Sequence, residues 1–243
     1  MDVATLREDM VDSLEHESKG VLSSPALSIA MREVPRERFV VAEGVAYEDR
    51  PSRAHGTTVL APSLVAVLLE ALSPRPDDRV LVVGAGVGYT AAVLAELVGA
   101  SNVHAVDIDR TLVLEARRNL ERAGYGAVLV DHRDGAHGLP EYAPFDRILV
   151  EAAGVEPPHA LRTQLTPGGR LIMPSGVGEQ RLVAYSRADI IDTFGPVAFR
   201  PLLVDGEQST ALERNRTERE DREFADRHQR SRTGWEHEWI DWS

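Results

Sequence analysis

From residue 79 onward, short apolar runs alternate with amphipathic stretches. The runs, rich in β-branched residues, read RVLVVGA, NVHAVDI, AVLVDH, DRILVEAA and GRLIMPSG. YTAAVLAELVG lies between the first two. RTLVLEARRNLERAG follows the second, with Leu112, Ala116 and Leu120 on one helical face and Gly124 as a helix stop. This alternation predicts a doubly wound α/β fold, a mostly parallel sheet with helices on both sides.

The ends of the chain follow other patterns. The stretches LREDMVDSL and SPALSIAMREV place apolar residues three and four apart, which predicts short helices before residue 45. Near the other end, RLVAYSR and PVAFRPLLV are two further strand-like runs. We therefore assign residues 1–206 to one domain that includes the N-terminal helices of residues 1–45.

A charged tail is predicted at residues 207–243. Its acidic and basic residues stand in the i,i+4 order that supports an exposed helix, as in Glu218 with Arg222 and Glu223 with Arg227. The end carries three large apolar side chains, which are Trp235, Trp239 and Trp242. We expect them to dock back onto the domain, with a partner site as the alternative.

Composition narrows the class of protein. The 243 residues include no cysteine, so disulfides and thiolate metal sites are excluded, and the histidines show no metal-ligand spacing. No apolar run approaches the length of a membrane span, and we expect a cytoplasmic monomer. The net charge of −12 disfavours nucleic acid and anionic membranes as partners.

The chain has a single lysine, Lys19, among 27 basic residues. Together with the excess of carboxylates, this favours a halophilic protein. A GC-rich genome is the alternative explanation for the missing lysines, although it does not explain the carboxylates.

A glycine-rich loop follows the first predicted strand. Gly84, Gly86 and Gly88 let the backbone turn sharply and approach a ligand closely, at the carboxyl end of the strand where doubly wound folds bind ligands. The dinucleotide fingerprint is G-x-G-x-x-G, whereas this loop reads GAGVGY. The spacing therefore argues against a pyrophosphate.

Two acidic residues follow the next two strands. Asp107, followed by Ile108, can accept hydrogen bonds from both hydroxyls of a ribose. Asp134, followed by Gly135, is placed to accept from the exocyclic amine of an adenine, since an ionised carboxylate only accepts. An adenosine site without phosphate contacts points to S-adenosylmethionine as the cofactor.

Several longer segments resemble the protein-L-isoaspartate O-methyltransferase family over roughly residues 20–208. They include VPRERFV, AYEDRP, VLVVGAGVGYTAAVLAELVG, LRTQLTPGGRLIMPSG and VAFRPL. The resemblance implies a seven-stranded Rossmann-like methyltransferase sheet. It also implies transfer of a methyl group from S-adenosylmethionine to the α-carboxylate of an L-isoaspartyl residue, the first step in repairing damaged proteins. The partner is then a peptide or protein that bears a carboxylate.

The predicted substrate loop departs from the family. The family reads G-Q-T-I-S-A-P-H there and uses the serine in catalysis, whereas residues 56–63 read GTTVLAPS. Leu60 stands at the serine position, Thr57 at the glutamine and Ser63 at the histidine. Leucine cannot donate a hydrogen bond to a carboxylate, so Thr57, Thr58 or Ser63 is expected to supply the hydroxyl, or the acceptor differs.

Other positions bear on the same site. Val82 replaces a family glutamate, and Glu151 replaces a family threonine near the expected crevice, where it repels a carboxylate, favours a cation or pairs with an arginine. Gln208 matches a cofactor-side glutamine of the family. Arg53 and His55 flank the substrate loop and are candidates to bind the substrate carboxylate.

Two other functions are compatible with parts of this pattern. The chain can be a divergent paralogue that binds S-adenosylmethionine but methylates another acceptor or has lost the reaction. An NAD-dependent oxidoreductase is disfavoured by the spacing of the glycine loop.

Overall fold

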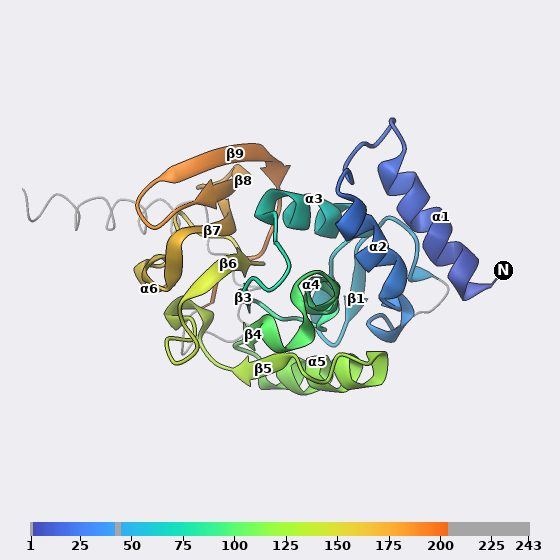
Figure 1. Cartoon of the computed structure of the whole chain (residues 1–243), viewed down its shortest axis with the longest axis horizontal. Coiled ribbons are helices and arrows are strands. Elements are labelled where there is room, and N and C mark those ends of the chain that lie inside the picture. Colours follow the sequence, from blue (N-terminus) through green and yellow to red (C-terminus); the bar gives the residue numbers. More distant parts are fainter. Residues whose placement is uncertain (1, 42–44, 204–243) are drawn as a thin grey trace, which may run out of the picture.

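The computed structural model describes residues 2–41 and 45–203 and contains a seven-stranded sheet (Figure 1). The strand order is β5-β4-β3-β6-β7-β8-β9. The pairs from β5 to β7 are parallel, and β8 runs antiparallel to both of its neighbours. The strands are β3 (Val80–Val83), β4 (Val103–Asp107), β5 (Leu129–His132), β6 (Phe145–Val150), β7 (Leu165–Ser175), β8 (Gln180–Tyr185) and β9 (Ile190–Val197). The predicted seven-stranded, mostly parallel sheet is confirmed.

The helices cover the two faces of this sheet unequally. The helical segments are α1 (Val3–Glu15), α2 (Pro25–Glu33), η1 (Arg36–Arg38), α3 (Pro62–Leu72), α4 (Tyr89–Val98), η3 (Ala100–Asn102), α5 (Arg110–Ala123), η4 (Gly135–His137) and α6 (His159–Thr163). The larger core joins α1 to α5 to one face through alternate strand residues such as Val80 and Val82. The smaller core joins Leu81 and Val83 to Leu161 of α6. Helices do lie on both faces, but of the α-helices in the described ranges only α6 packs into the smaller core.

Both cores contain residues of the same central strands, because successive side chains of a strand point to opposite faces. The four residues of β3 are all buried, as are the five of β4. A parallel strand buried on both faces has no solvent side, which explains why all of these residues except His104 and Asp107 are apolar.

One predicted strand lies elsewhere. The run at residues 196–204 was expected to form a strand, but β9 contains only its first two residues and otherwise covers the more polar stretch before it, at the exposed sheet edge. The following segment instead runs beside Ala153, which donates its N–H to Arg200 O at 2.8 Å and accepts from Leu202 N at 2.8 Å. The apolar run therefore reflects packing near the end of β6 rather than a further sheet strand.

A separate two-stranded hairpin consists of β1 (Ser52–Ala54) and β2 (Thr57–Val59). Its turn residues His55 and Gly56 both have positive φ, 50° and 81°, as a tight hairpin of this twist requires. His55 Nε2 lies 3.4 Å from Glu115 Oε1, which links the turn to α5.

A buried arginine binds the backbone just beyond the hairpin. Arg36 donates from Nε to Ala46 O at 2.8 Å and from Nη2 to Leu60 O at 2.6 Å. Its guanidinium also lies over the Tyr89 ring, 4.4 Å from the centroid. These contacts fix the backbone at Leu60 against the rest of the domain.

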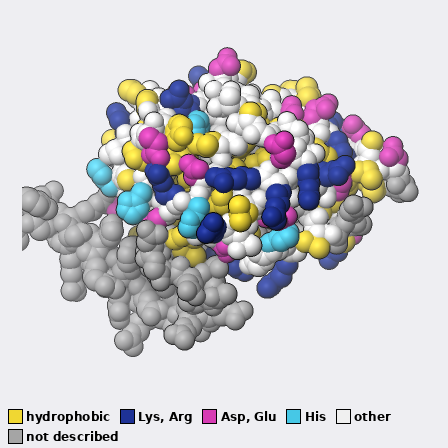
Figure 2. Space-filling view, turned by 90° about the horizontal axis from the view of Figure 1, so that it is seen from below, with side chains coloured by type: hydrophobic (Ala, Val, Ile, Leu, Met, Phe, Trp, Pro, Cys, Tyr) yellow, Lys and Arg dark blue, Asp and Glu magenta, His cyan; other side chains and the backbone are white. Residues whose placement is uncertain are grey.

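The described surface shows no single dominant charge in the view of Figure 2. Acidic and basic side chains are interspersed there, with hydrophobic side chains between them. None of the described helices is long and apolar enough to cross a membrane.

Candidate active site

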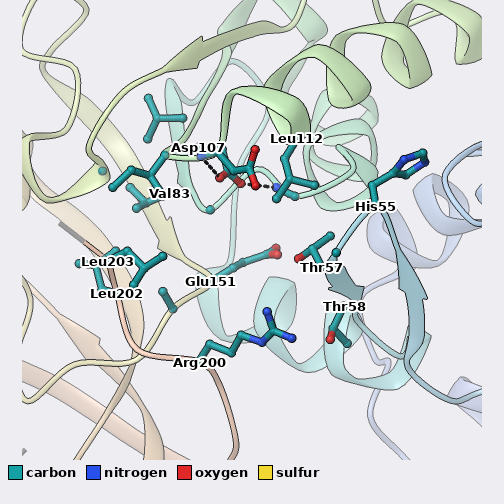
Figure 3. Close-up of a pocket in the computed structure, with 18 of the residues that line it drawn as sticks. His55, Thr57, Thr58, Val83, Asp107, Leu112, Glu151, Arg200, Leu202 and Leu203 are labelled. Atoms are coloured by element: carbon teal, nitrogen blue, oxygen red, sulfur yellow. Dashed lines mark hydrogen bonds between the residues drawn. The ribbon is translucent and has the colours of Figure 1, made fainter. Parts of the chain in front are cut away.

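A cavity of about 750 Å³ lies at the carboxyl ends of β3, β4 and β6, where the hairpin faces the sheet (Figure 3). This is the edge at which open parallel sheets bind ligands. The lining residues from the sheet side include Val83, Gly84, Gly86, Val106, Asp107, Ile108, Gly135 and Glu151. Those from the hairpin and the segment after β9 include Arg53, His55, Thr57, Thr58, Leu60, Arg200 and Leu202. The cavity thus brings together most of the predicted site residues.

The glycine loop forms one wall of the cavity. Gly84 and Gly86 line it with φ values of 91° and 53°, and the N–H groups of Gly84 and Ala85 both donate to Val106 O. A side chain at Gly86 would meet no atom within 4 Å, so its Cβ would occupy open space in the cradle. Gly88 is not among the lining residues, because it packs against α5, where a Cβ would come within 3.2 Å of Leu120 Cγ.

Asp107 ends β4 and is held by backbone donors. Its Oδ2 accepts from Gly86 N at 2.9 Å and its Oδ1 from Asp109 N at 3.0 Å. Burial raises the pKa of the Asp107 carboxyl, and these backbone N–H groups oppose the shift. The carboxylate is therefore oriented before any ligand arrives, with Ile108 beside it in the lining.

Asp134 and Gly135 lie beyond the end of β5. Asp134 is buried and its Oδ1 accepts from Ala136 N at 2.8 Å, so it caps η4. Gly135 lines the cavity, and a Cβ there would lie 2.3 Å from Val83 Cγ1. Only glycine lets this backbone come so close to β3, and contact of Asp134 with an adenine stays a prediction.

Glu151 directly follows β6 and reaches into the middle of the cavity, with Asp107 on one side and Thr57 and Arg200 on others (Figure 3). Burial raises the pKa of the Glu151 carboxyl to about 7, the Asp107 charge adds to the rise, and the Thr90 hydroxyl opposes it. Glu151 Oε1 is buried and has no hydrogen-bond partner among the described residues.

The candidates on the substrate loop separate into two groups. Thr57, Thr58 and Leu60 line the cavity, together with Arg53 and His55 before them. Ser63 is not part of the lining. It lies in the first turn of α3, where its backbone N–H donates to Asp49 Oδ1 at 2.9 Å.

Arg200 is a cavity residue that the sequence analysis did not identify. Its guanidinium points from the segment after β9 toward the space near Thr58 and Glu151 (Figure 3). The sequence does show an arginine inside the apolar run VAFRPLL. The strand predicted for this run gave no reason to place that arginine in the cavity.

The remaining predictions lie partly outside the described residues. Gln208 and the three tryptophans of the tail belong to the residues that the structure does not describe. In the ranges 2–41 and 45–203, no group of three or more histidine, aspartate or glutamate side chains is arranged to hold a metal ion.

Known proteins resemble this chain over most of its length. The family model for protein-L-isoaspartate(D-aspartate) O-methyltransferase matches residues 5–208. A protein-L-isoaspartate O-methyltransferase from Aeropyrum pernix is 45% identical over 179 residues, which are 72% of this chain and 68% of that protein. One from Methylorubrum extorquens is 44% identical over 210 residues, 83% of this chain and 90% of that protein.

Solved structures agree on the fold. A structure named protein-L-isoaspartate O-methyltransferase has a TM-score of 0.72 and 32% identity, covering 86% of this chain and 69% of its own. A Plasmodium falciparum structure described as such an enzyme, in complex with S-adenosyl-L-homocysteine, also has a TM-score of 0.72. It covers 81% of this chain and 98% of its own, and at 24% identity it supports the fold alone. Fold, strand-end cavity and family match agree, and the chain belongs to the protein-L-isoaspartate(D-aspartate) O-methyltransferase family.

Proposed function

We propose that this protein is an S-adenosylmethionine-dependent carboxyl O-methyltransferase that acts on L-isoaspartyl residues of damaged proteins. The observation that carries the proposal is one cavity shared by two kinds of groups. A glycine loop and an oriented Asp107 lie on its sheet side, and hydroxyl groups and arginines lie on its hairpin side. In a chain of this family, the first set fits the cofactor and the second fits an acceptor carboxylate.

The residues of the sheet side fit S-adenosylmethionine. Asp107 presents an oriented carboxylate, which accepts hydrogen bonds and suits a ribose diol. A Cβ at Gly86 would meet open space, so this glycine leaves room for a ligand to lie against the backbone. When bound, the cofactor supplies a methyl group on a positively charged sulfur as the electrophile.

The hairpin side fits an acceptor that is already an anion. Arg200 and Arg53 are guanidinium groups in the cavity lining, and a guanidinium can donate two parallel hydrogen bonds to one carboxylate. The hydroxyls of Thr57 and Thr58 supply further donors that Leu60 cannot. We assign Arg200 the main role in binding the acceptor carboxylate, because Figure 3 shows its guanidinium facing the space between Thr58 and Glu151.

In this reaction the residues need to orient the acceptor but do not need to transfer a proton. A carboxylic acid of ordinary pKa is ionised at neutral pH, so the acceptor oxygen needs no general base. Holding that oxygen in line with the methyl group supplies most of the acceleration in such a displacement. Arg200, Thr57 and Thr58 therefore act by orienting the acceptor carboxylate.

The test is transfer of radiolabelled methyl groups from S-adenosylmethionine to an isoaspartyl peptide, with the matching aspartyl peptide as the control. The assay is run in molar salt because the chain carries a net charge of −12, and calorimetric binding of the cofactor checks that the protein is folded. Labelling of the isoaspartyl peptide alone supports the proposal. Cofactor binding without labelling of either peptide would refute it and favour a paralogue with another acceptor.

A further inference from the structure

We propose that the Glu151 carboxylate binds the α-ammonium group of the methionine arm of S-adenosylmethionine. The inference rests on the proposed function only for the presence of this cofactor. It does not depend on which acceptor receives the methyl group.

The backbone fixes where this side chain lies. Glu151 N donates to Val83 O at 2.8 Å, so the residue continues the pairing of β6 with β3. A Cβ built at Gly84 would lie 3.5 Å from Glu151 Cβ, which places the side chain next to the glycine loop. Glu151 thus lines the cavity from the strand on the far side of β3 from Asp107.

The Glu151 carboxylate is only partly stabilised by the protein, because the Thr90 hydroxyl is the one group in the described part of the chain that favours its charge. Oε1 is buried without a hydrogen-bond donor among the described residues, and no ion pair found in that part of the chain involves Glu151. The negative charge of Asp107 adds to the cost of ionisation. Burying a charge is unfavourable unless it is paired and hydrogen-bonded, so the site favours a ligand that brings a cationic donor.

The strand order indicates which part of the cofactor reaches Glu151. Asp107 ends β4, Gly84 follows β3 and Glu151 follows β6, and these three strands are neighbours. Adjacent strands are about 4.8 Å apart. With the ribose at Asp107, the amino-acid arm crosses the glycine loop toward Glu151.

Two cationic groups lie on that arm, the sulfonium and the α-ammonium. Only the ammonium has N–H groups, and Oε1 lacks a donor, so only the ammonium satisfies both the charge and the hydrogen-bonding need. A carboxylate aimed at the sulfonium would instead compete with the acceptor for the methyl group. Both considerations select the ammonium.

The experiment combines one substitution with one deletion in the ligand. Binding of S-adenosylhomocysteine and of its analogue without the α-amino group is measured by calorimetry for the natural protein and for Glu151→Gln. The substitution is expected to lower the affinity for S-adenosylhomocysteine by about tenfold or more. The analogue without the amino group should bind both proteins equally, because the interaction is already removed.

Further ligands and variants separate this role from others. The substitution should weaken the binding of S-adenosylmethionine as much as that of S-adenosylhomocysteine. The affinity for 5′-methylthioadenosine, which lacks the amino-acid arm, should differ by no more than about twofold between Glu151→Gln and the natural protein. Glu141→Gln changes an exposed carboxylate that pairs with Arg133 outside the cavity lining and should leave all affinities unchanged. Glu151→Thr replaces Glu151→Gln if the latter does not fold.

Three results would overturn the inference. The first is equal weakening of methylthioadenosine, which indicates a general change of the cavity. The second is weakening of S-adenosylmethionine alone, which indicates contact with the sulfonium. The third is no change for any ligand. Failure of isoaspartyl peptides to be methylated would refute the proposed function but leave these binding results valid.

Discussion

The two ends of the cavity are built from different parts of the chain. At the Asp107 end, the carboxylate is held by the backbone N–H groups of Gly86 in the glycine loop and of Asp109 at the start of α5. At the other end, Glu151, Arg200 and the two threonines present side chains that come from separate segments. The first end is oriented by the fold itself, and the second depends on which side chains the segments carry. We therefore expect the first to tolerate few changes and the second to set what the protein binds.

The strongest test of the backbone-held end is Asp107→Ala. Loss of the carboxylate removes the proposed acceptor for the ribose and the partner of Gly86 N, so the affinity for S-adenosylhomocysteine should fall about a hundredfold or more. The affinity of this variant for methylthioadenosine should fall equally, whereas Glu151→Gln should leave that affinity almost unchanged. Calorimetry measures both affinities, with Asp131→Ala, which removes a partly exposed partner of Arg117, as the control. Retained affinity for methylthioadenosine would contradict the assignment.

The buried carboxyl of Glu151 is expected to lower the stability of the cofactor-free protein above neutral pH. Because the folded pKa of Glu151 is about 7, above the usual value of 4.5, its contribution to stability is lost as the pH rises from 4.5 through 7. The charges and hydroxyl acting on it are Asp107 and Thr90. Glu151→Gln should therefore raise the free energy of unfolding of the cofactor-free protein by roughly 1–3 kcal/mol at pH 8 and by much less near pH 5. Denaturant titrations at the two pH values measure this, and an equal gain at both would contradict it.

Arg200 tests the side-chain end from the acceptor side. Arg200→Gln should raise the KM for an isoaspartyl peptide about tenfold, because a bidentate charged interaction becomes at most one neutral hydrogen bond. Arg200→Lys should recover part of the loss. Binding of S-adenosylhomocysteine should stay unchanged, which separates an acceptor contact from a cofactor contact. Equal losses for both ligands would place Arg200 at the cofactor instead.

The smallest effect is expected from Leu60→Ser. The backbone at Leu60 is held by Arg36, so the new hydroxyl would enter the cavity without moving the loop. One added donor near the acceptor should raise kcat a few-fold, less than a fully aligned oxyanion donor supplies. The methyl-transfer assay measures this, with Ser63→Ala, outside the cavity lining, as the control. A fall in kcat would indicate that the apolar side chain itself contacts the acceptor.

The same contrast explains which parts could be predicted from the sequence. The sheet, Gly84, Gly86 and Asp107 follow local patterns, since a glycine loop after a buried strand can be recognised from neighbouring residues alone. Arg200 was missed because its place depends on pairing with Ala153 rather than on its own segment. Ser63 was one of three candidate hydroxyls in the predicted substrate loop, but α3 begins at Pro62 and Ser63 is not part of the cavity lining.

The β1–β2 hairpin is a compact unit at one end of the cavity. The hairpin carries two cavity threonines on three residues of β2, and its register is set by a turn with two positive φ values. Because the turn fixes the register, replacing residues at fixed length would change the cavity-lining groups one at a time, whereas inserting one residue would shift the pairing of every later residue of the hairpin. Small substitutions in this hairpin can therefore change the side chains at one end of the cavity while the backbone contacts of Asp107 at the other end stay in place.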